Sequence, residues 1–187
     1  MQELLRVGLI YRIHPKITAM AGSAYLLNYP YSQYPSVSPY VRSPEKRMFE
    51  QIAISDSLQS LSILHRFRLE QRWSGRMDSA DVKKVDYWNY TNRIRYLIRI
   101  SKPIIRSLNG KGGLYAVGQN EIFISFGKNV KSNIFNQNRL TFLIGTRITK
   151  SLSLECGYLN QIIQQANIID NKRSEEHTSE LQSRVDI

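Results

Sequence analysis

The sequence lacks most of the features that identify a functional class. Only one of its 187 residues is cysteine, which excludes an internal disulfide framework and a cysteine-based zinc site. Uninterrupted apolar runs are only a few residues long, whereas a membrane-spanning helix needs roughly 20 residues. The chain contains no glycine-rich nucleotide-binding motif and no residue cluster with metal-ligand spacing. We therefore expect no cofactor and no metal site.

Acidic residues are the minority among the charges, with 15 Asp and Glu against 26 Lys and Arg and a net charge of +11. Basic proteins can bind the phosphate backbone of nucleic acids. Here the basic residues are spread along alternating positions, and no recognition helix or RNA-binding motif is present. We therefore expect no nucleic-acid partner. The alternative interpretation is a soluble basic β-barrel or sandwich that binds nucleic acid or another polyanion.

The end of the chain is expected to be foreign to the protein. Residues Arg173 to Ser183 read RSEEHTSELQS, which is the translation of a common sequencing adapter, and residues 184–187 would follow from the adjoining index. We therefore set residues 173–187 aside as an artefact and take residues 166–172 as the end of the native sequence. Residues 1–172 carry 24 basic and 11 acidic residues.

Alternation with a period of two is the dominant pattern, and it predicts β-strands. From Leu61 to Trp73, the odd positions are mostly apolar and the even positions are mostly charged. The segment Thr91–Lys102 repeats this pattern with isoleucine and arginine. A helix would scatter both sets around its circumference. Six further segments are predicted to be strands: Leu4–Ile13, Ile17–Asn28, Met48–Asp56, Leu114–Phe126, Asn138–Thr149 and Leu152–Gln165.

Short and long connections alternate along the chain. The connections at His14–Lys16, Ser57–Ser60 and Lys150–Ser151 are short, whereas a long one begins with the tyrosine-rich stretch Tyr29–Tyr40, which we expect to be an exposed loop. This alternation is typical of an antiparallel up-and-down meander. Outer-membrane barrels have short periplasmic turns at one end and long loops at the other.

Two environments could explain the two-faced strands. In a soluble barrel or sandwich, the apolar face points inward and the arginines face water. In a membrane barrel, the apolar face meets lipid and the arginines line the lumen. Strand lengths of about 10–13 residues favour the membrane, as do the aromatic residues Tyr11, Trp73, Tyr115 and Tyr158 near strand ends. The preference for Arg over Lys also favours an enclosed interior, where the guanidinium group pairs with carboxylates.

Several motifs follow one another in an order that resembles a known family. They are RFRLEQR at Arg66–Arg72, NEIF at Asn120–Phe123, NQNRL at Asn136–Leu140 and LECGYLNQ at Leu154–Gln161. Together with neighbouring segments, they make the chain similar, over roughly residues 1–165, to the domain of unknown function 2490 family of outer-membrane β-barrels of Gram-negative bacteria. The resemblance implies no established activity.

The resemblance also implies a location and partners. It implies a signal peptide that is removed after export, residence in the outer membrane, and contact with outer-membrane lipid and the barrel-assembly machinery. It further implies strands before residue 1 and after about residue 165. We therefore expect an all-β, antiparallel up-and-down transmembrane β-barrel, present as an incomplete fragment with about eight strands in residues 1–165.

Arginine and glutamate residues form the candidate site. Antiparallel pairing would bring the arginines of Leu61–Trp73 beside those of Thr91–Lys102, and like charges that face each other need counter-charges. We predict that glutamates of the same parity supply them in a salt-bridged network that fills the lumen. A basic lumen that attracts anions is the alternative. The expected network consists of Arg66, Arg68, Glu70, Arg72, Arg93, Arg95, Arg99, Glu121, Arg139, Arg147 and Glu155.

We expect no enzymatic activity. A lipid-hydrolysing barrel would need a serine nucleophile with a histidine base, and no motif ties His65 to a serine. Cys156 lies on an apolar face and is expected to act as a small hydrophobic residue. The predicted function is an outer-membrane β-barrel that is structural or a narrow, anion-favouring conduit, with its ligand unknown.

Overall fold

The computed structural model describes residues 2–29, 42–77, 84–105, 113–130, 134–149 and 152–163, and residues 174–176 by their backbone. Residues 30–40 of the expected tyrosine-rich loop Tyr29–Tyr40 lie outside the described residues. The structure contains no helix in this described part of the chain. It accordingly offers no helical segment there that is long and apolar enough to cross a bilayer.

All regular structure in the described residues is β-strand, and the strands are long. Their lengths reach 21 residues in β5, which is well above the average of about 5–6 for soluble proteins. The strands are β1 (Gln2–His14), β2 (Ile17–Asn28), β3 (Ser43–Leu58), β4 (Leu61–Met77), β5 (Val85–Ile105), β6 (Leu114–Phe126), β7 (Phe135–Arg147), β8 (Ser153–Ile163) and β9 (Ser174–Glu176).

The strands form one antiparallel sheet in chain order from β1 to β9. This confirms the expected all-β, up-and-down arrangement and the positions of the eight strands β1 to β8. The strands β3, β4 and β5 extend beyond the predicted bounds of Met48–Asp56, Leu61–Trp73 and Thr91–Lys102. The short β9 lies within the segment that we assigned to the adapter, and it pairs with β8 at Gln161–Ile163.

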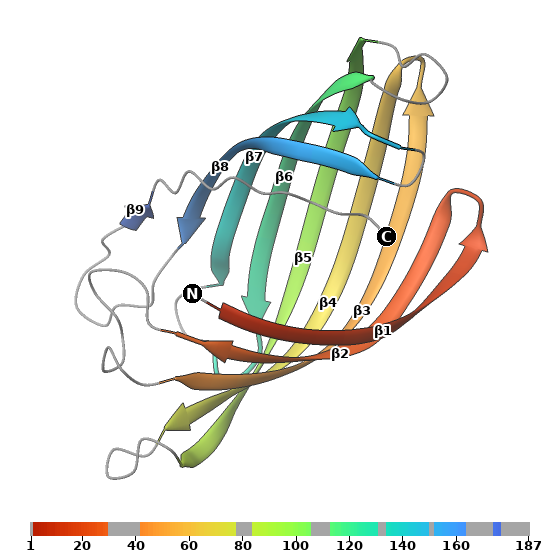
Figure 1. Ribbon diagram of the computed structural model, residues 1–187. Coiled ribbons are helices and arrows are strands. Elements are labelled where there is room, and N and C mark those ends of the chain that lie inside the picture. The colour runs from red at the N-terminus through yellow and green to blue at the C-terminus, as the bar shows by residue number, and fades with distance from the viewer. Residues whose placement is uncertain are drawn as a thin grey trace.

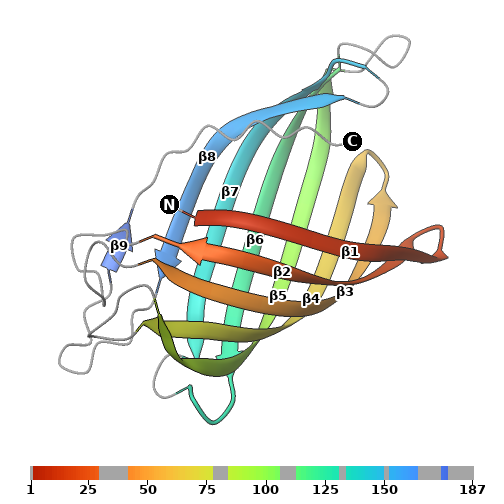
Figure 2. The ribbon, with the colours of Figure 1, turned by 60° about the horizontal axis from the view of Figure 1, so that its bottom comes forward.

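The sheet is strongly curved, so that its strands wrap around a common interior (Figures 1 and 2). Among the described residues, the pairing runs from β1 to β9 and does not join β1 back to β8. Because side chains alternate between the two faces of a strand, each row of paired residues lies either inside or outside this curve. The row that contains Arg68 and Arg95 points inward, and Phe67 and Tyr96 form part of the adjacent outward row.

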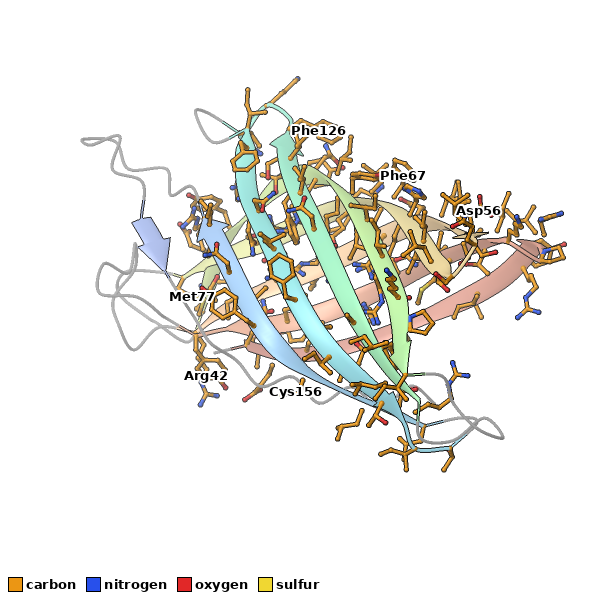
Figure 3. The ribbon with its side chains drawn as sticks, turned by 90° about the horizontal axis from the view of Figure 1, so that it is seen from above. Arg42, Asp56, Phe67, Met77, Phe126 and Cys156 are labelled. Carbon is orange, nitrogen blue, oxygen red and sulfur yellow. The ribbon has the colours of Figure 1, made fainter. Side chains whose placement is uncertain are left out.

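The charged face is the buried one. Glu70 is 2% exposed and Arg68 is 7% exposed, whereas the outward neighbours Phe67 and Leu69 are 47% and 37% exposed. Phe67, Phe126 and Cys156 project from the outer side of the curved sheet (Figure 3). Most charged side chains of the sheet are therefore inside and many large apolar side chains are outside, while Phe49, Leu97 and Phe123 are apolar residues buried among the interior charges.

Candidate functional site

The centre of the interior is an ion-pair network between β4, β5 and β6. Glu70 accepts hydrogen bonds from Arg93 at 2.6 and 2.9 Å and from Arg95 at 2.8 Å. Arg95 also donates to Glu121 at 2.8 Å, and Arg66 donates to the same carboxylate oxygen at 2.8 Å. Arg95 thus bridges two buried carboxylates, which the planar guanidinium group does better than an ammonium group could.

A second ion-pair cluster lies toward the long-loop end of the strands. Glu45 of β3 accepts two hydrogen bonds from Arg72 of β4, from Nε at 2.7 Å and from Nη2 at 3.0 Å. It also accepts a hydrogen bond from Arg47, two residues along its own strand. Because Glu45 is only 2% exposed, these guanidinium groups, and not water, neutralise its carboxylate.

A third cluster lies toward the short-turn end, where Glu155 of β8 is paired with Arg99 of β5. The hydroxyl group of Tyr115 also donates to Glu155, at 2.9 Å. The register pairs Tyr115 of β6 with Gly145 of β7 and Gly145 with Glu155 of β8. The tyrosine ring therefore passes over β7 to reach Glu155. A Cβ atom at residue 145 would overlap this ring, so Gly145 supplies the space that the contact requires.

Aromatic rings support the interior arginines. Phe123 is 1% exposed, and the guanidinium carbons of Arg93, Arg95 and Arg139 lie 5.2, 4.5 and 5.1 Å from the centre of its ring. Phe49 holds Arg68 in the same way, at 5.0 Å. These cation–π contacts fix the guanidinium planes and fill the space between them.

The structure brings most of the predicted network residues together. The ion pairs of Arg66, Arg68, Arg93 and Arg95 are with Glu70 or Glu121. Arg72 contacts Glu45, and Arg99 contacts Glu155. Arg139 is opposite Glu121 in the register and donates to Gln161 at 3.1 Å. Arg147 also has inward parity, but it is exposed at the end of β7 and forms no ion pair within the described residues.

Sequence reasoning missed Glu45, Arg47 and the interior phenylalanines. The predicted third strand began at Met48, so Glu45 and Arg47 fell in a connection. Phe49 and Phe123 share the parity of the charged residues, and they were not singled out. A signal was present for Glu45, because the odd positions of β3 continue inward without interruption from Gln51 back to residue 45.

The outer face carries apolar side chains, and its polar side chains pair with one another. Gln71 donates to Glu50 at 3.1 Å, His65 and Tyr96 are hydrogen-bonded at 2.9 Å, and Asn120 donates to Asn138 at 3.1 Å. His65 thus contacts a tyrosine. Such pairing lowers the cost of polar groups in an apolar environment.

An aromatic belt crosses the outer face near the long-loop end. Tyr25, Lys46, Trp73 and Tyr90 are paired in one row across β2 to β5. The rings of Trp73 and Tyr90 are 5.2 Å apart, and the Lys46 ammonium group lies 4.6 Å from the ring of Trp88.

The expectation that Tyr115 belongs to an outer aromatic belt is wrong. Its position in β6 has the parity of Glu121, so its ring points inward and its hydroxyl group reaches Glu155. Tyr11, Trp73 and Tyr158 have outward parity, as expected.

The arrangement concentrates charged side chains on the concave side of the sheet. The described residues contain no group of three or more histidine, cysteine or acidic side chains that could hold a metal ion. Among the described residues, four inward glutamates, Glu45, Glu70, Glu121 and Glu155, face a larger number of inward arginines. The interior is therefore polar, mostly paired and positively charged overall.

A family model described as "Protein of unknown function (DUF2490)" matches residues 1–173 of the chain. This is the family that the sequence motifs resemble. No curated protein and no solved structure matches the chain.

Proposed function

Because the chain belongs to the family described as protein of unknown function (DUF2490), which carries no assigned activity, we propose a function from its geometry. The protein is an outer-membrane β-barrel whose interior is closed by arginine–glutamate pairs. Its role is to form a stable, lipid-embedded wall, and lipid is its immediate partner.

The observation that carries this proposal is the inversion of the two faces. Soluble monomeric proteins rarely expose contiguous apolar patches larger than a few hundred Å². Here Leu5, Met48, Phe67, Phe142 and Ile144 are each 47–71% exposed on the outer side of β1, β3, β4 and β7, while glutamates are buried inside. In water, both the exposed apolar outer face and the buried charged inner face would be unfavourable. Lipid around the outer face and ion pairing among the inner charges would instead stabilise the fold.

The aromatic belt supports the same proposal. Tyrosine and tryptophan residues gather at membrane–water interfaces, where the ring is in an apolar layer and the polar group reaches water. The row of Tyr25, Lys46, Trp73 and Tyr90 would mark one such interface. Asp56 and Lys16, whose side chains form an exposed ion pair at 2.7 Å, would lie in water beyond the other.

The interior contacts favour a closed lumen over a wide pore. Arg99 reaches from β5 to Glu155 on β8, and Arg66 reaches from β4 to Glu121 on β6. These side chains cross the concave side of the sheet, so they occupy the space that an open channel would need.

The single cysteine provides a direct test. Cys156 has outward parity on β8, is exposed, and is paired with Ile144 of β7. The full chain would be refolded into lipid vesicles and treated with a water-soluble, membrane-impermeant maleimide. We expect Cys156 to stay unmodified until the vesicles are dissolved and the protein is unfolded.

Two control variants make the test independent of orientation. In a Cys156→Ser background, Ser57→Cys and Asn129→Cys place a thiol at opposite ends of the strands, where both residues are exposed. At least one of these variants should react at once in intact vesicles. Rapid modification of Cys156 itself would contradict the proposal and favour a soluble basic β-protein, for which salt-dependent binding to nucleic acid would be measured next.

A further inference from the structure

The interior contains more buried positive charge than its carboxylates neutralise. Around Phe123 and Phe49, Arg68, Arg93 and Arg95 form their ion pairs with Glu70 and Glu121 among the described residues, and Glu121 is also paired with Arg66. The side chains of Arg68 and Arg93 are both 7% exposed, and that of Arg95 is 13% exposed. Unbalanced charge in such an environment is costly unless a counter-charge is supplied.

Arg68 is the least neutralised member of this group. Its Nε and Nη2 atoms donate to the neutral amide oxygen of Gln51, at 2.9 and 2.5 Å. Its Nη1 atom lies 3.7 Å from Glu70, which is beyond hydrogen-bond distance, and makes no hydrogen bond within the described part of the chain. Arg68 therefore has donors available on a buried cation.

The surroundings of Arg68 are positive. The register places it directly opposite Arg95, and like charges in this position repel each other. Arg66 and Arg6 also act on it, and the guanidinium carbon of Arg6 lies 5.9 Å from the same Phe49 ring that holds Arg68. Glu70 is the carboxylate that offsets these three arginines at Arg68.

On the side of the interior next to Arg68, small residues of β1 to β3 alternate with the larger inward residues Met20, Leu26 and Phe49, and the ring of Phe49 packs over Gly22. Gly8 and Gly22 are paired on the inward face of β1 and β2, and Ala24 and Ala53 have the same parity on β2 and β3. Long side chains from β4 to β7 instead cover the rest of the concave face. A small ligand that reached Arg68 from this side would not have to displace an ion pair.

We propose that Arg68, with Arg6, Arg66 and Arg95 around it, binds a small oxyanion such as inorganic phosphate inside the barrel. The anion accepts hydrogen bonds from Nη1 of Arg68 and neutralises the repulsion between Arg68 and Arg95. This inference rests on the proposed function, because only an enclosed interior makes the excess charge costly. It assigns a ligand class to an interior that otherwise has a purely structural role.

The test is the stability of the refolded full chain in detergent micelles or vesicles as a function of phosphate concentration, with chloride at matched ionic strength as the reference. We expect the unfolding midpoint to rise with phosphate in a saturable way. In Arg68→Gln, the apparent affinity for phosphate should fall at least tenfold.

Two further variants separate a site from general charge screening. Arg147→Gln removes the same charge from an exposed inward position at the end of β7, so it should keep the full phosphate response. Arg68→Lys retains the charge without the guanidinium fork, so it should respond more weakly than the parent. An equal loss in Arg68→Gln and Arg147→Gln, or no saturable response in the parent, would overturn the inference.

The outcome can be assigned to the correct hypothesis because insertion is measured separately. A chain that protects Cys156 in vesicles but ignores phosphate would disprove the anion site and leave the membrane barrel intact. A chain that leaves Cys156 reactive would remove the proposed function itself.

Discussion

At the scale of single residues, the position of a carboxylate decides its effect on stability. Glu70 and Glu50 lie on neighbouring strands, but the first points into the interior and the second points outward. Glu70 is held by Arg93 and Arg95, whereas Glu50 accepts a hydrogen bond from Gln71. The same side chain is thus a counter-charge on one face and an unneutralised charge on the apolar face.

This contrast predicts opposite effects for two alanine substitutions. Glu70→Ala leaves buried guanidinium groups without their carboxylate and should destabilise the fold by about 3–5 kcal/mol. Glu50→Ala removes a carboxylate from the apolar face and should be neutral or stabilising. Urea unfolding of the vesicle-embedded protein, followed by tryptophan fluorescence, measures both. Equal losses in the two variants would count against the interior network.

At the scale of the strand, alternation assigns each residue of β7 to the outer face or to the interior of the sheet. Phe142 is 55% exposed on the outer side, and the adjacent Thr141 is buried at 5%. In water, a charged residue at an exposed position costs little. In lipid, the cost depends on depth and is greatest at the middle of the bilayer.

We therefore expect Phe142→Arg to destabilise the folded protein by about 2–4 kcal/mol in vesicles. Ile148→Arg is the matched control, because Ile148 follows the last residue of β7 and is 47% exposed; its cost should be about 0–1 kcal/mol. The ratio of folded to unfolded protein, read from heat-modifiable electrophoretic mobility, compares the variants. If both substitutions were tolerated equally, the outer face would be in contact with water.

At the scale of the whole molecule, the sheet is stabilised from two sides. Its strands are hydrogen-bonded in sequence order, and ion pairs cross its concave side between strands that are not neighbours. The pair between Arg99 and Glu155 joins residues 56 positions apart in the chain. These cross-connections reinforce the curvature and fill the interior.

This filling predicts low permeability. Vesicles that contain the refolded protein should not swell in small sugars, and planar bilayers should show no large steady conductance at neutral pH. The double variant Arg99→Ala and Glu155→Ala removes a crossing pair together with its counter-charge, so it should raise permeability without stranding a carboxylate. A porin-like conductance in the parent chain would contradict a closed interior.

The alternation of apolar and charged residues was sufficient to predict the eight strands, their antiparallel order and the two sets of side chains that share a face. This information is local, because successive side chains of a strand point to opposite sides. The shared parity of Arg66, Arg68, Glu70, Arg93, Arg95 and Glu121 therefore follows from the sequence alone, and the strand register confirms it.

Tertiary structure alone decided which face is enclosed and which partners meet there. Alternation is the same for a soluble and a membrane barrel, so only curvature identifies the charged face as the buried one. Long arginine side chains reach carboxylates one to three strands away, and their choice depends on register and on space left by residues such as Gly145. That is why the pairing of Arg72 with Glu45 and the inward position of Tyr115 could not be obtained from residue spacing.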